Sequence, residues 1–336
     1  MNKKEIFLGK DLPPMVIYNL NNEETDFKLK HEEVDGRTVE LKRLSDLYFN
    51  EDLIEIDGVR IPSIFLAKTG LEKISEEILE DNYELPEEFK KFGKGVIGRT
   101  NAFNGQIVSL SDFEIDKITE EVKLKIRQAR YFDFLSTNIS IDISLKTHDP
   151  FFQAGMVLRD YEIDNGKEVS LSRSNLANML GVDFFITSEE NEGNYFMFVR
   201  GSENHAIHFD RGIMSCPGAT PTWSEDLRLT GFSNYLRNLI EVELKEELLL
   251  DADEFNIGNC YFYKNLIRGP EVIIQIKLIK SIEDIALKCQ RNKSVLEECD
   301  RIYAVPAEIE ALNSLTKLGY DINITTKTGV YLILEK

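Results

Sequence analysis

The pattern of hydrophobic and polar positions predicts a regular order of strands and helices from about Leu176 onward. Residues 182–187 and 195–200 are short apolar runs on either side of an acidic turn ending in Gly193, which is typical of a β-hairpin. The remaining elements are expected in this order: a helix over 233–250, strands over 260–263 and 272–278, a helix over 281–290, a strand ending at Val305-Pro306, a helix over 307–318 and a strand over 330–334. The fold class that follows is α/β, a mixed sheet flanked by helices.

The first 150 residues show a less regular pattern of short strands and acidic helical stretches. Residues 59–66 are expected to form a strand. A short helix is expected over 71–79, where Ile74 and Ile78 have helical spacing. We interpret Gly93-Lys94-Gly95-Val96-Ile97-Gly98 as a flexible connector, although it fits GxGxxG, because no strand clearly precedes it.

A change of pattern marks the expected domain boundary. His148-Asp149-Pro150 interrupts an apolar stretch, and a helix is expected to begin in the polar run 170–175 and to end near Gly181. The chain has 336 residues, which exceeds the usual size of one hydrophobic core. We therefore predict an additional N-terminal α+β domain over residues 1–150, a second domain over 170–336, and two separate cores that meet between about 148 and 170.

The amino-acid composition makes some classes of binding partner improbable. The net charge is −19, from 59 acidic and 40 basic residues, and such a field repels nucleic acids and anionic membranes. No apolar run is long enough to span a bilayer, and the N-terminus lacks the apolar stretch of a secretory signal. The four cysteines are scattered without a CxxC pair, which suits reduced thiols. We expect a cytoplasmic protein with a small-molecule partner and leave a homodimer open.

The helix expected over 233–250 carries the candidate chemistry. At about 100° per residue, Glu243 and Glu247 fall within roughly 20° of Leu236, on the face that also holds Leu239 and Ile240. Glu246 lies beside them, whereas Glu241 and Lys245 point the other way. Carboxylates therefore occupy positions where the pattern asks for leucine.

Like charges crowded on an inward face need compensation. A hard divalent cation, Mg²⁺ or Mn²⁺, bound by carboxylate oxygens would supply it. The alternative is that this turn lies at a rim, where the glutamates are solvated or paired with Lys and Arg. The helix alone leaves both interpretations open.

The region from Leu176 to the C-terminus resembles the Nudix superfamily. Residues 242–250, Val-Glu-Leu-Lys-Glu-Glu-Leu-Leu-Leu, match the second half of the Nudix box at all three glutamates and both apolar positions, and Gly218 matches its leading glycine. The resemblance implies a Nudix-like fold that binds a nucleotide. It also implies that Glu243, Glu246 and Glu247 are metal ligands, with Glu246 or Glu247 acting in catalysis.

The sequence departs from the box at three places. Val242 replaces the arginine that pairs with box carboxylates in the family, Leu249 replaces a glycine, and the spacing from Gly218 to Glu243 is about ten residues longer than in the family. The insertion is assigned to 223–231. Glu225 is a candidate for the first glutamate of the box, at the wrong offset.

Other polar residues have two interpretations each. Arg200 ends a strand, and its guanidinium suits phosphate oxygens, so it is either a ligand-binding cation or a plain strand-end arginine. His205 and His208, with Asp210, have loose metal-ligand spacing or belong to a solvated loop. Trp223 stacks on a base or covers the core.

Two functions remain in view. One is a Mg²⁺-dependent hydrolase that cleaves the pyrophosphate of a nucleoside diphosphate derivative, which the three glutamates favour. The other is a catalytically silent Nudix-like sensor that binds such a nucleotide, which Val242, Leu249 and the insertion favour.

Overall fold

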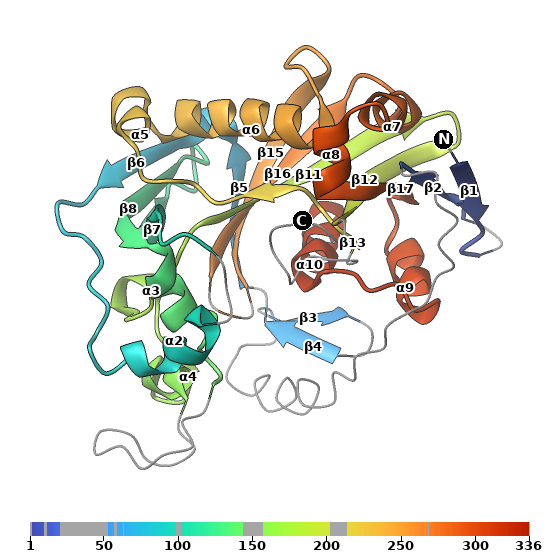
Figure 1. The fold of residues 1–336 in the computed structure, drawn as a ribbon. Coiled ribbons are helices and arrows are strands. Elements are labelled where there is room, and N and C mark those ends of the chain that lie inside the picture. The colour runs from blue at the N-terminus through green and yellow to red at the C-terminus, as the bar shows by residue number, and fades with distance from the viewer. Residues whose placement is uncertain are drawn as a thin grey trace.

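A ten-stranded mixed sheet forms the centre of the computed structural model, which describes residues 2–9, 12–20, 53–56, 59–62, 64–98, 102–143, 157–201, 214–265, 267 and 269–335 (Figure 1). The strands, in order across the sheet, are β1 (Asn2–Ile6), β2 (Met15–Asn19), β17 (Cys299–Pro306), β12 (Gly193–Gly201), β11 (Gly181–Glu190), β16 (Pro270–Leu278), β15 (Phe255–Lys264) and β5 (Ile64–Gly70). Two short strands, β13 (Met214–Ser215) and β14 (Gly218–Ala219), pair with β12 and β11. The β11–β16 pair is parallel and its neighbours are antiparallel, so the mixed sheet is confirmed.

Helices cover both faces of this sheet. In Figure 1, α6 (Phe232–Leu248), α7 (Ile282–Cys289) and α8 (Lys293–Glu298) lie above it, and α9 (Ile309–Lys317) and α10 (Ile324–Glu335) lie below it. Strand alternation separates the two cores: Val182 and Phe184 of β11 pack on the α6 side, and Phe185 packs on the α10 side. No helix among the described residues is long and apolar enough to cross a membrane.

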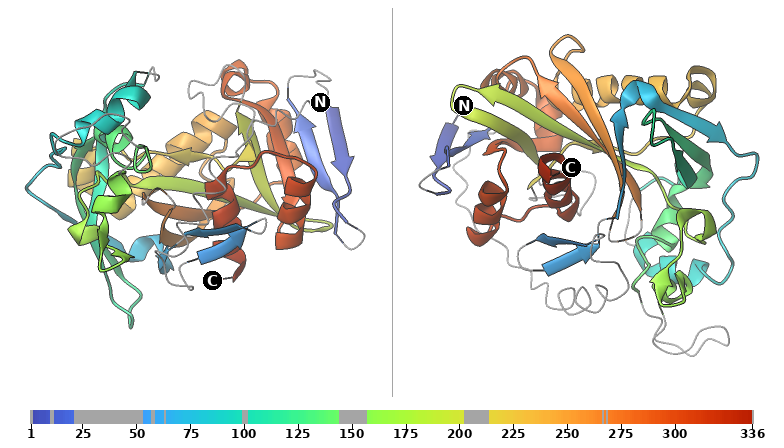
Figure 2. Two further views of the ribbon diagram at one scale, coloured as in Figure 1. Left: turned by 90° about the horizontal axis from the view of Figure 1, so that it is seen from below. Right: turned by 180° about the vertical axis from the view of Figure 1, so that it is seen from behind.

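A smaller sheet stands beside the main one, at the left in Figure 1 and as a distinct group of elements in Figure 2. It contains β6 (Ile74–Ile78), β8 (Val122–Arg130) and β7 (Gln106–Ile115) in that order, and α2 (Lys90–Ile97), α3 (Tyr131–Ser136) and α4 (Leu158–Tyr161) lie at its lower end. Val108, Leu124 and Ile126 of this sheet belong to the same hydrophobic core as α6. The small sheet is therefore an extension of the main core.

The prediction of a separate N-terminal domain over residues 1–150 is wrong in its boundary. Strand β2 pairs with β17, and β5 pairs with β15, so segments from the first 70 residues complete the main sheet on both sides. Without them, β15 and β17 would present open edges, which folded proteins generally cover. Residues 148–156, which belong to the region assigned to the boundary, lie outside the described residues.

Several predicted elements are confirmed close to their expected bounds. The hairpin of β11 and β12, the helix α6, the strands β15 and β16, and the helices α7 and α9 all lie where the sequence pattern put them. The strand expected over 59–66 is divided into β4 (Val59–Pro62), which pairs with β3 (Leu53–Ile56), and the beginning of β5.

Two predicted types of element are wrong because the apolar spacing fits both a helix and a strand. Residues 71–79 contain a 3-10 turn and β6, since Ile74 and Ile78, four residues apart, share one face of either element. The strand expected over 330–334 is part of α10. At Gly329, a Cβ would lie 2.1 Å from Cζ of Phe185, so the glycine lets this helix approach the sheet closely.

Two further corrections concern glycine- and serine-rich stretches. Residues 93–98 lie mainly within α2, and a Cβ on Gly93 would lie 2.1 Å from Oγ of Ser136 in α3, so this glycine serves helix packing. The helix expected from 170 to Gly181 is limited to a 3-10 turn over Leu171–Arg173. Beyond it, backbone hydrogen bonds join Leu110 to Asn178 and Leu180 to Val108, so this segment runs beside β7.

A truncated chain beginning at Leu176 tests the continuity of the sheet. It would lack β2 and β5 and would expose the edges of β17 and β15 together with apolar surface under the small sheet. We expect aggregation or non-cooperative unfolding, measured by size-exclusion chromatography and thermal circular dichroism. A monomer that unfolds cooperatively would show that residues 1–175 are dispensable for the core.

Candidate functional site

A pocket opens where the hairpin strands β11 and β12 diverge. They pair with each other only from Ile186 to Glu190, and farther along β14 pairs with Val182 and Asp183 while β13 pairs with Val199 and Arg200. The space that remains has a volume of about 930 Å³. It is lined by the start of β11, residues 215–220, the C-terminal turns of α6, and residues that precede or lie in α8 and precede α10.

All three box glutamates of α6 line this pocket, and so does Gly218. Glu243 and Glu247 are half-buried, and Glu246 is exposed. The buried residues of α6 include a row spaced by four residues: Phe232, Leu236, Ile240, Leu244 and Leu248. Four residues advance an α-helix by about 40° beyond a full turn. Toward the C-terminal end of α6, the buried row therefore points in a different direction from Leu236. The glutamates therefore lie on the flank of the buried face rather than at its centre.

The environment of Glu243 is unfavourable for its charged form. Burial, and then the charge of Glu246, raise the pKa of Glu243 above its ordinary value. Within the described parts of the chain, no group of three or more His, Cys, Asp or Glu side chains is arranged to hold a metal ion. The three carboxylates share one pocket without converging on a common point, and their roles as metal ligands stay predictions.

The helix α6 ends in a left-handed turn at Leu249, the position at which the Nudix box has glycine. Leu249 has φ 57° and ψ 25°, which is the left-handed conformation. Its backbone N–H donates to the carbonyl of Lys245, and the N–H of Leu250 donates to the carbonyl of Leu244, both at 3.1 Å. This is a Schellman arrangement, usually made by glycine. Leu249 thus retains the turn at the cost of backbone strain.

Gly218 has a packing role in the same wall. A Cβ at this position would lie 2.9 Å from the carbonyl oxygen of Val182 and 3.1 Å from Oδ1 of Asp183. The absence of a side chain lets β14 lie against β11. Close approach of backbone is a usual reason for glycine beside a ligand site.

The beginning of α6 is held by the small sheet. Gly231, with φ 81°, precedes the helix and has no side chain to cap the first turn. Instead, Oε2 of Glu76 in β6 accepts a hydrogen bond from the backbone N–H of Phe232 at 2.9 Å, and the hydroxyl of Ser233 donates to the carbonyl of Leu71 at 2.8 Å. A carboxylate at this end also suits the helix dipole.

The insertion anticipated between Gly218 and α6 packs on the same small sheet. It contains α5 (Glu225–Thr230), and the backbone N–H of Trp223 donates to the carbonyl of Gln106 at 3.2 Å. The Trp223 ring is buried beneath the guanidinium of Arg228, 5.4 Å from its centre, and it does not line the pocket. Of the two interpretations of Trp223, the structure supports the one in which it covers the core.

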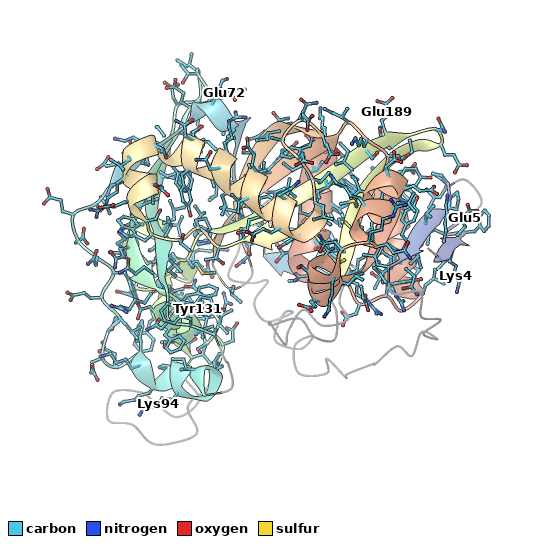
Figure 3. All side chains as sticks on the ribbon, turned by 45° about the horizontal axis from the view of Figure 1, so that its top comes forward. Lys4, Glu5, Glu72, Lys94, Tyr131 and Glu189 are labelled. Carbon is cyan, nitrogen blue, oxygen red and sulfur yellow. The ribbon has the colours of Figure 1, made fainter. Side chains whose placement is uncertain are left out.

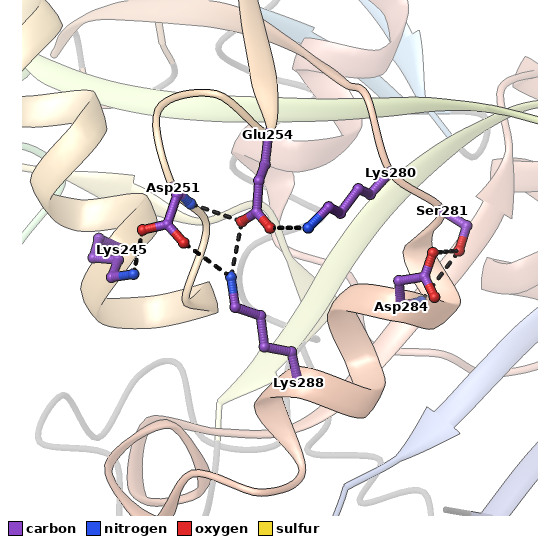
Figure 4. Close-up of polar contacts among 7 residues, drawn as sticks. All are labelled: Lys245, Asp251, Glu254, Lys280, Ser281, Asp284 and Lys288. Atoms are coloured by element: carbon purple, nitrogen blue, oxygen red, sulfur yellow. Dashed lines mark hydrogen bonds and ion pairs between the residues drawn. The ribbon is translucent and has the colours of Figure 1, made fainter.

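A network of lysines and carboxylates fastens the turn after α6 (Figure 4). Lys245 pairs with Asp251, and Lys288 of α7 pairs with Asp251 at 3.3 Å and with Glu254 at 2.8 Å. Lys280 also pairs with Glu254. Burial alone would raise the pKa of Glu254, but hydrogen bonds from Lys280 and Lys288 lower it to about 2. The network holds the C-terminal end of α6 and engages Lys245, the lysine that follows Glu243 by two residues.

Among the other candidate residues, Arg200 is described by the structure and is not part of the pocket. Its guanidinium forms a fork with the carboxylate of Asp300, with Nε donating to Oδ1 at 2.7 Å. This pair joins β12 to β17, as expected of a strand-end arginine. His205, His208 and Asp210 lie outside the described residues.

Several polar residues of the pocket were not predicted from the sequence, among them Asp183, Asn292, Glu297 and Asn323. They come from separate parts of the chain and meet only through the fold. Glu297 and Asp183 add to the negative charge of the pocket. Elsewhere, charged side chains such as Glu72 and Glu189 project from the surface (Figure 3).

Comparison with known proteins gives remote structural neighbours. No protein-family model and no curated protein sequence matches the chain. Solved structures that are similar include the NUDIX domain of Shewanella oneidensis NrtR complexed with ADP ribose, at 13% identity and a TM-score of 0.30, covering 47% of this chain and 88% of that one. A mutT/nudix family protein from Listeria innocua has 16% identity and a TM-score of 0.30, covering 47% and 92%. The Ap4A hydrolase of C. elegans has 12% identity and a TM-score of 0.26, covering 46% and 98%.

Replacement of Glu76 tests the hydrogen bond between the small sheet and the beginning of α6. Glu76→Ala removes the acceptor for the first N–H of the helix, and we expect the free energy of unfolding to fall by about 1 kcal/mol, the usual effect of losing a cap. Urea denaturation measures the change. Glu80→Ala, at an exposed position in the same segment, is the matched control and should change the value by less than about 0.5 kcal/mol.

The left-handed backbone at Leu249 predicts that a glycine variant is more stable than an alanine variant, the reverse of the usual order in a helix. Leu249→Gly and Leu249→Ala lose the same side-chain packing, but only glycine adopts a positive φ without strain. We expect the Gly variant to be more stable than the Ala variant by about 1 kcal/mol in urea denaturation. An Ala variant as stable as the Gly variant would contradict the left-handed conformation.

Proposed function

We propose that the protein is a Mg²⁺-dependent hydrolase that cleaves the pyrophosphate of a nucleoside diphosphate derivative. The observation that carries the proposal is the placement of Glu243, Glu246 and Glu247 along one pocket that also includes Gly218. These are the positions that match the Nudix box in sequence. A volume of about 930 Å³ suits a nucleotide-sized ligand.

The donor set fits a hard divalent cation in its chemistry. Carboxylate oxygens are the protein ligands that Mg²⁺ and Mn²⁺ prefer. The pKa of Glu243 is raised by burial and then by the charge of Glu246, and a bound cation would favour the charged carboxylate against both. Glu246 is exposed and Glu247 half-buried, so rotamer changes can bring their carboxylates closer. We assign Glu243, Glu246 and Glu247 as the residues that would hold the metal.

The roles of the glutamates follow from their positions. When bound, Mg²⁺ would neutralise the phosphate charge and lower the pKa of an attacking water. Glu246 or Glu247 would accept the proton of that water, because both are box carboxylates at the pocket. The remaining carboxylates keep the negative charge that holds the cation. Turnover should therefore require deprotonated glutamates.

A nucleotide sensor without turnover is the second candidate. Val242, at the position of the box arginine, is 50% exposed, and no other cation takes its place among the described contacts of Glu243. The beginning of α6 is hydrogen-bonded to the small sheet through Glu76. A ligand that moves α6 would therefore also move that sheet. Cleavage of nucleoside diphosphate derivatives into a nucleoside monophosphate and a phosphomonoester, screened with and without Mg²⁺, separates the two candidates.

Metal dependence predicts a gain in thermal stability and a loss of turnover in variants. Mg²⁺ or Mn²⁺ should raise the melting temperature, because a ligand that binds only the folded state stabilises it. Glu246→Gln and Glu247→Gln each remove a negative ligand and keep the shape. Each should reduce the metal-induced shift and lower turnover on the order of a hundredfold or more.

Glu241→Gln is the matched control on the same helix. Glu241 does not line the pocket, so this variant should keep both the metal-induced shift and the turnover. Equal damage from Glu241→Gln would mean that the assignment of the helix face is wrong. Nucleotide binding that survives both pocket substitutions, without any turnover, would replace the hydrolase with the sensor.

A further inference from the structure

We propose that Asn292 and Asn323 orient the ligand of this pocket by donating hydrogen bonds from their side-chain NH₂ groups to non-bridging oxygens of a diphosphate. Both residues line the pocket together with the box glutamates of α6. The inference rests on the proposed function, because it takes the ligand to be a diphosphate ester. It adds two specificity residues outside the box.

Asn292 is fixed in one orientation by its role at the start of α8. Its Oδ1 accepts hydrogen bonds from the backbone N–H groups of Ser294 at 2.9 Å and Val295 at 3.3 Å. Only the oxygen can accept from backbone N–H, so the identity of the two amide atoms is determined by these contacts. The NH₂ group is therefore directed away from the first turn of α8.

Asn323 is fixed in the same way immediately before α10. Its Oδ1 accepts from the backbone N–H of Thr325 at 2.9 Å, and its own backbone N–H donates to the carbonyl of Met214 in β13 at 2.9 Å. In the part of the chain that the structure describes, neither Asn292 nor Asn323 has a hydrogen bond from Nδ2 to another protein group. Both side chains are half-buried, so their donors remain accessible.

The charge of the pocket explains why neutral donors suit this position. Glu243, Glu246, Glu247 and Glu297 line the pocket, and a diphosphate enters such a field only with cations that neutralise it. Arg200 is engaged by Asp300, and Lys245 by Asp251. Diphosphate oxygens that do not face the metal still require donors. The two amides supply them from the residues that precede α8 and α10, without a positive charge that would pair with the glutamates.

The competing explanation is that both asparagines only cap their helices. Serine and aspartate cap a helix about as well as asparagine, but neither carries an NH₂ donor. Asn292→Ser and Asn323→Ser therefore remove the proposed donor and keep the cap. Asn292→Asp and Asn323→Asp keep the cap and place a carboxylate where the donor was. Ser224→Asp, at the start of α5 and outside the pocket, is the control for an added charge at a cap.

The experiment is calorimetric titration of the full-length protein with methylenediphosphonate, a diphosphate analogue that cannot be hydrolysed, in the presence of Mg²⁺. We expect each Ser variant to bind about tenfold more weakly, the scale of one hydrogen bond to a charged acceptor. Each Asp variant should bind more weakly still. Melting temperatures should stay close to that of the unmodified protein, and Ser224→Asp should bind normally.

Unchanged affinity in the Ser variants would overturn the inference, and so would normal affinity in the Asp variants. Either result would mean that the two asparagines cap their helices and do not bind the diphosphate. Failure of the unmodified protein to bind the analogue would also overturn it. The hydrolase proposal fails separately, on turnover. If the protein binds the analogue through both amides but cleaves no nucleoside diphosphate derivative to a nucleoside monophosphate, this inference stands and the hydrolase proposal fails.

Discussion

The placement of three carboxylates, two of them half-buried, on the last turns of α6 is the constraint on which the arrangement of the site depends. Glu243, Glu246 and Glu247 share one pocket, where burial and then the charge of Glu246 raise the pKa of Glu243. Both ends of the helix are held by contacts outside the helix. Glu76 accepts a hydrogen bond from the first turn of α6. Ion pairs of Lys245 and Lys288 with Asp251 and Glu254 stabilise the loop that follows its last turn.

The sheet gives this helix its position relative to the pocket. Because β13 and β14 lie between the diverging ends of β11 and β12, the hairpin leaves an opening next to the C-terminal turns of α6. Segments from the first 70 residues close the sheet at both sides, and the small sheet extends its core under the beginning of α6. The N-terminal half thus supports the site without contributing a described residue to the lining of the pocket.

The sequence predicted those helices, strands and turns whose formation depends on residues a few positions apart. The β11–β12 hairpin and α6 were predicted because apolar periodicity and turn residues act within a few positions, and the three glutamates were found from helical phasing and box spacing. Residues 71–79 and 330–334 were assigned to the wrong type of element because the spacing of their apolar residues fits both types. The contribution of β2 and β5 to the main sheet could not be predicted, because strand partners far apart in sequence leave no local pattern.

The site shows the same division between local and distant information. Leu249 was recognised as a departure from the box, but its left-handed backbone depends on the Schellman hydrogen bonds and not on residue type. Asn292 and Asn323 were missed because each is an ordinary cap in its own segment, and only the fold brings both to the pocket.

A crystal structure of the protein with Mn²⁺, with the anomalous scattering of the metal measured, tests the central claim most directly. The account predicts an anomalous peak within coordination distance of carboxylate oxygens from Glu243, Glu246 and Glu247. A peak elsewhere, or fully soaked crystals without a peak at these three side chains, would contradict the assignment of α6 as the metal-binding helix.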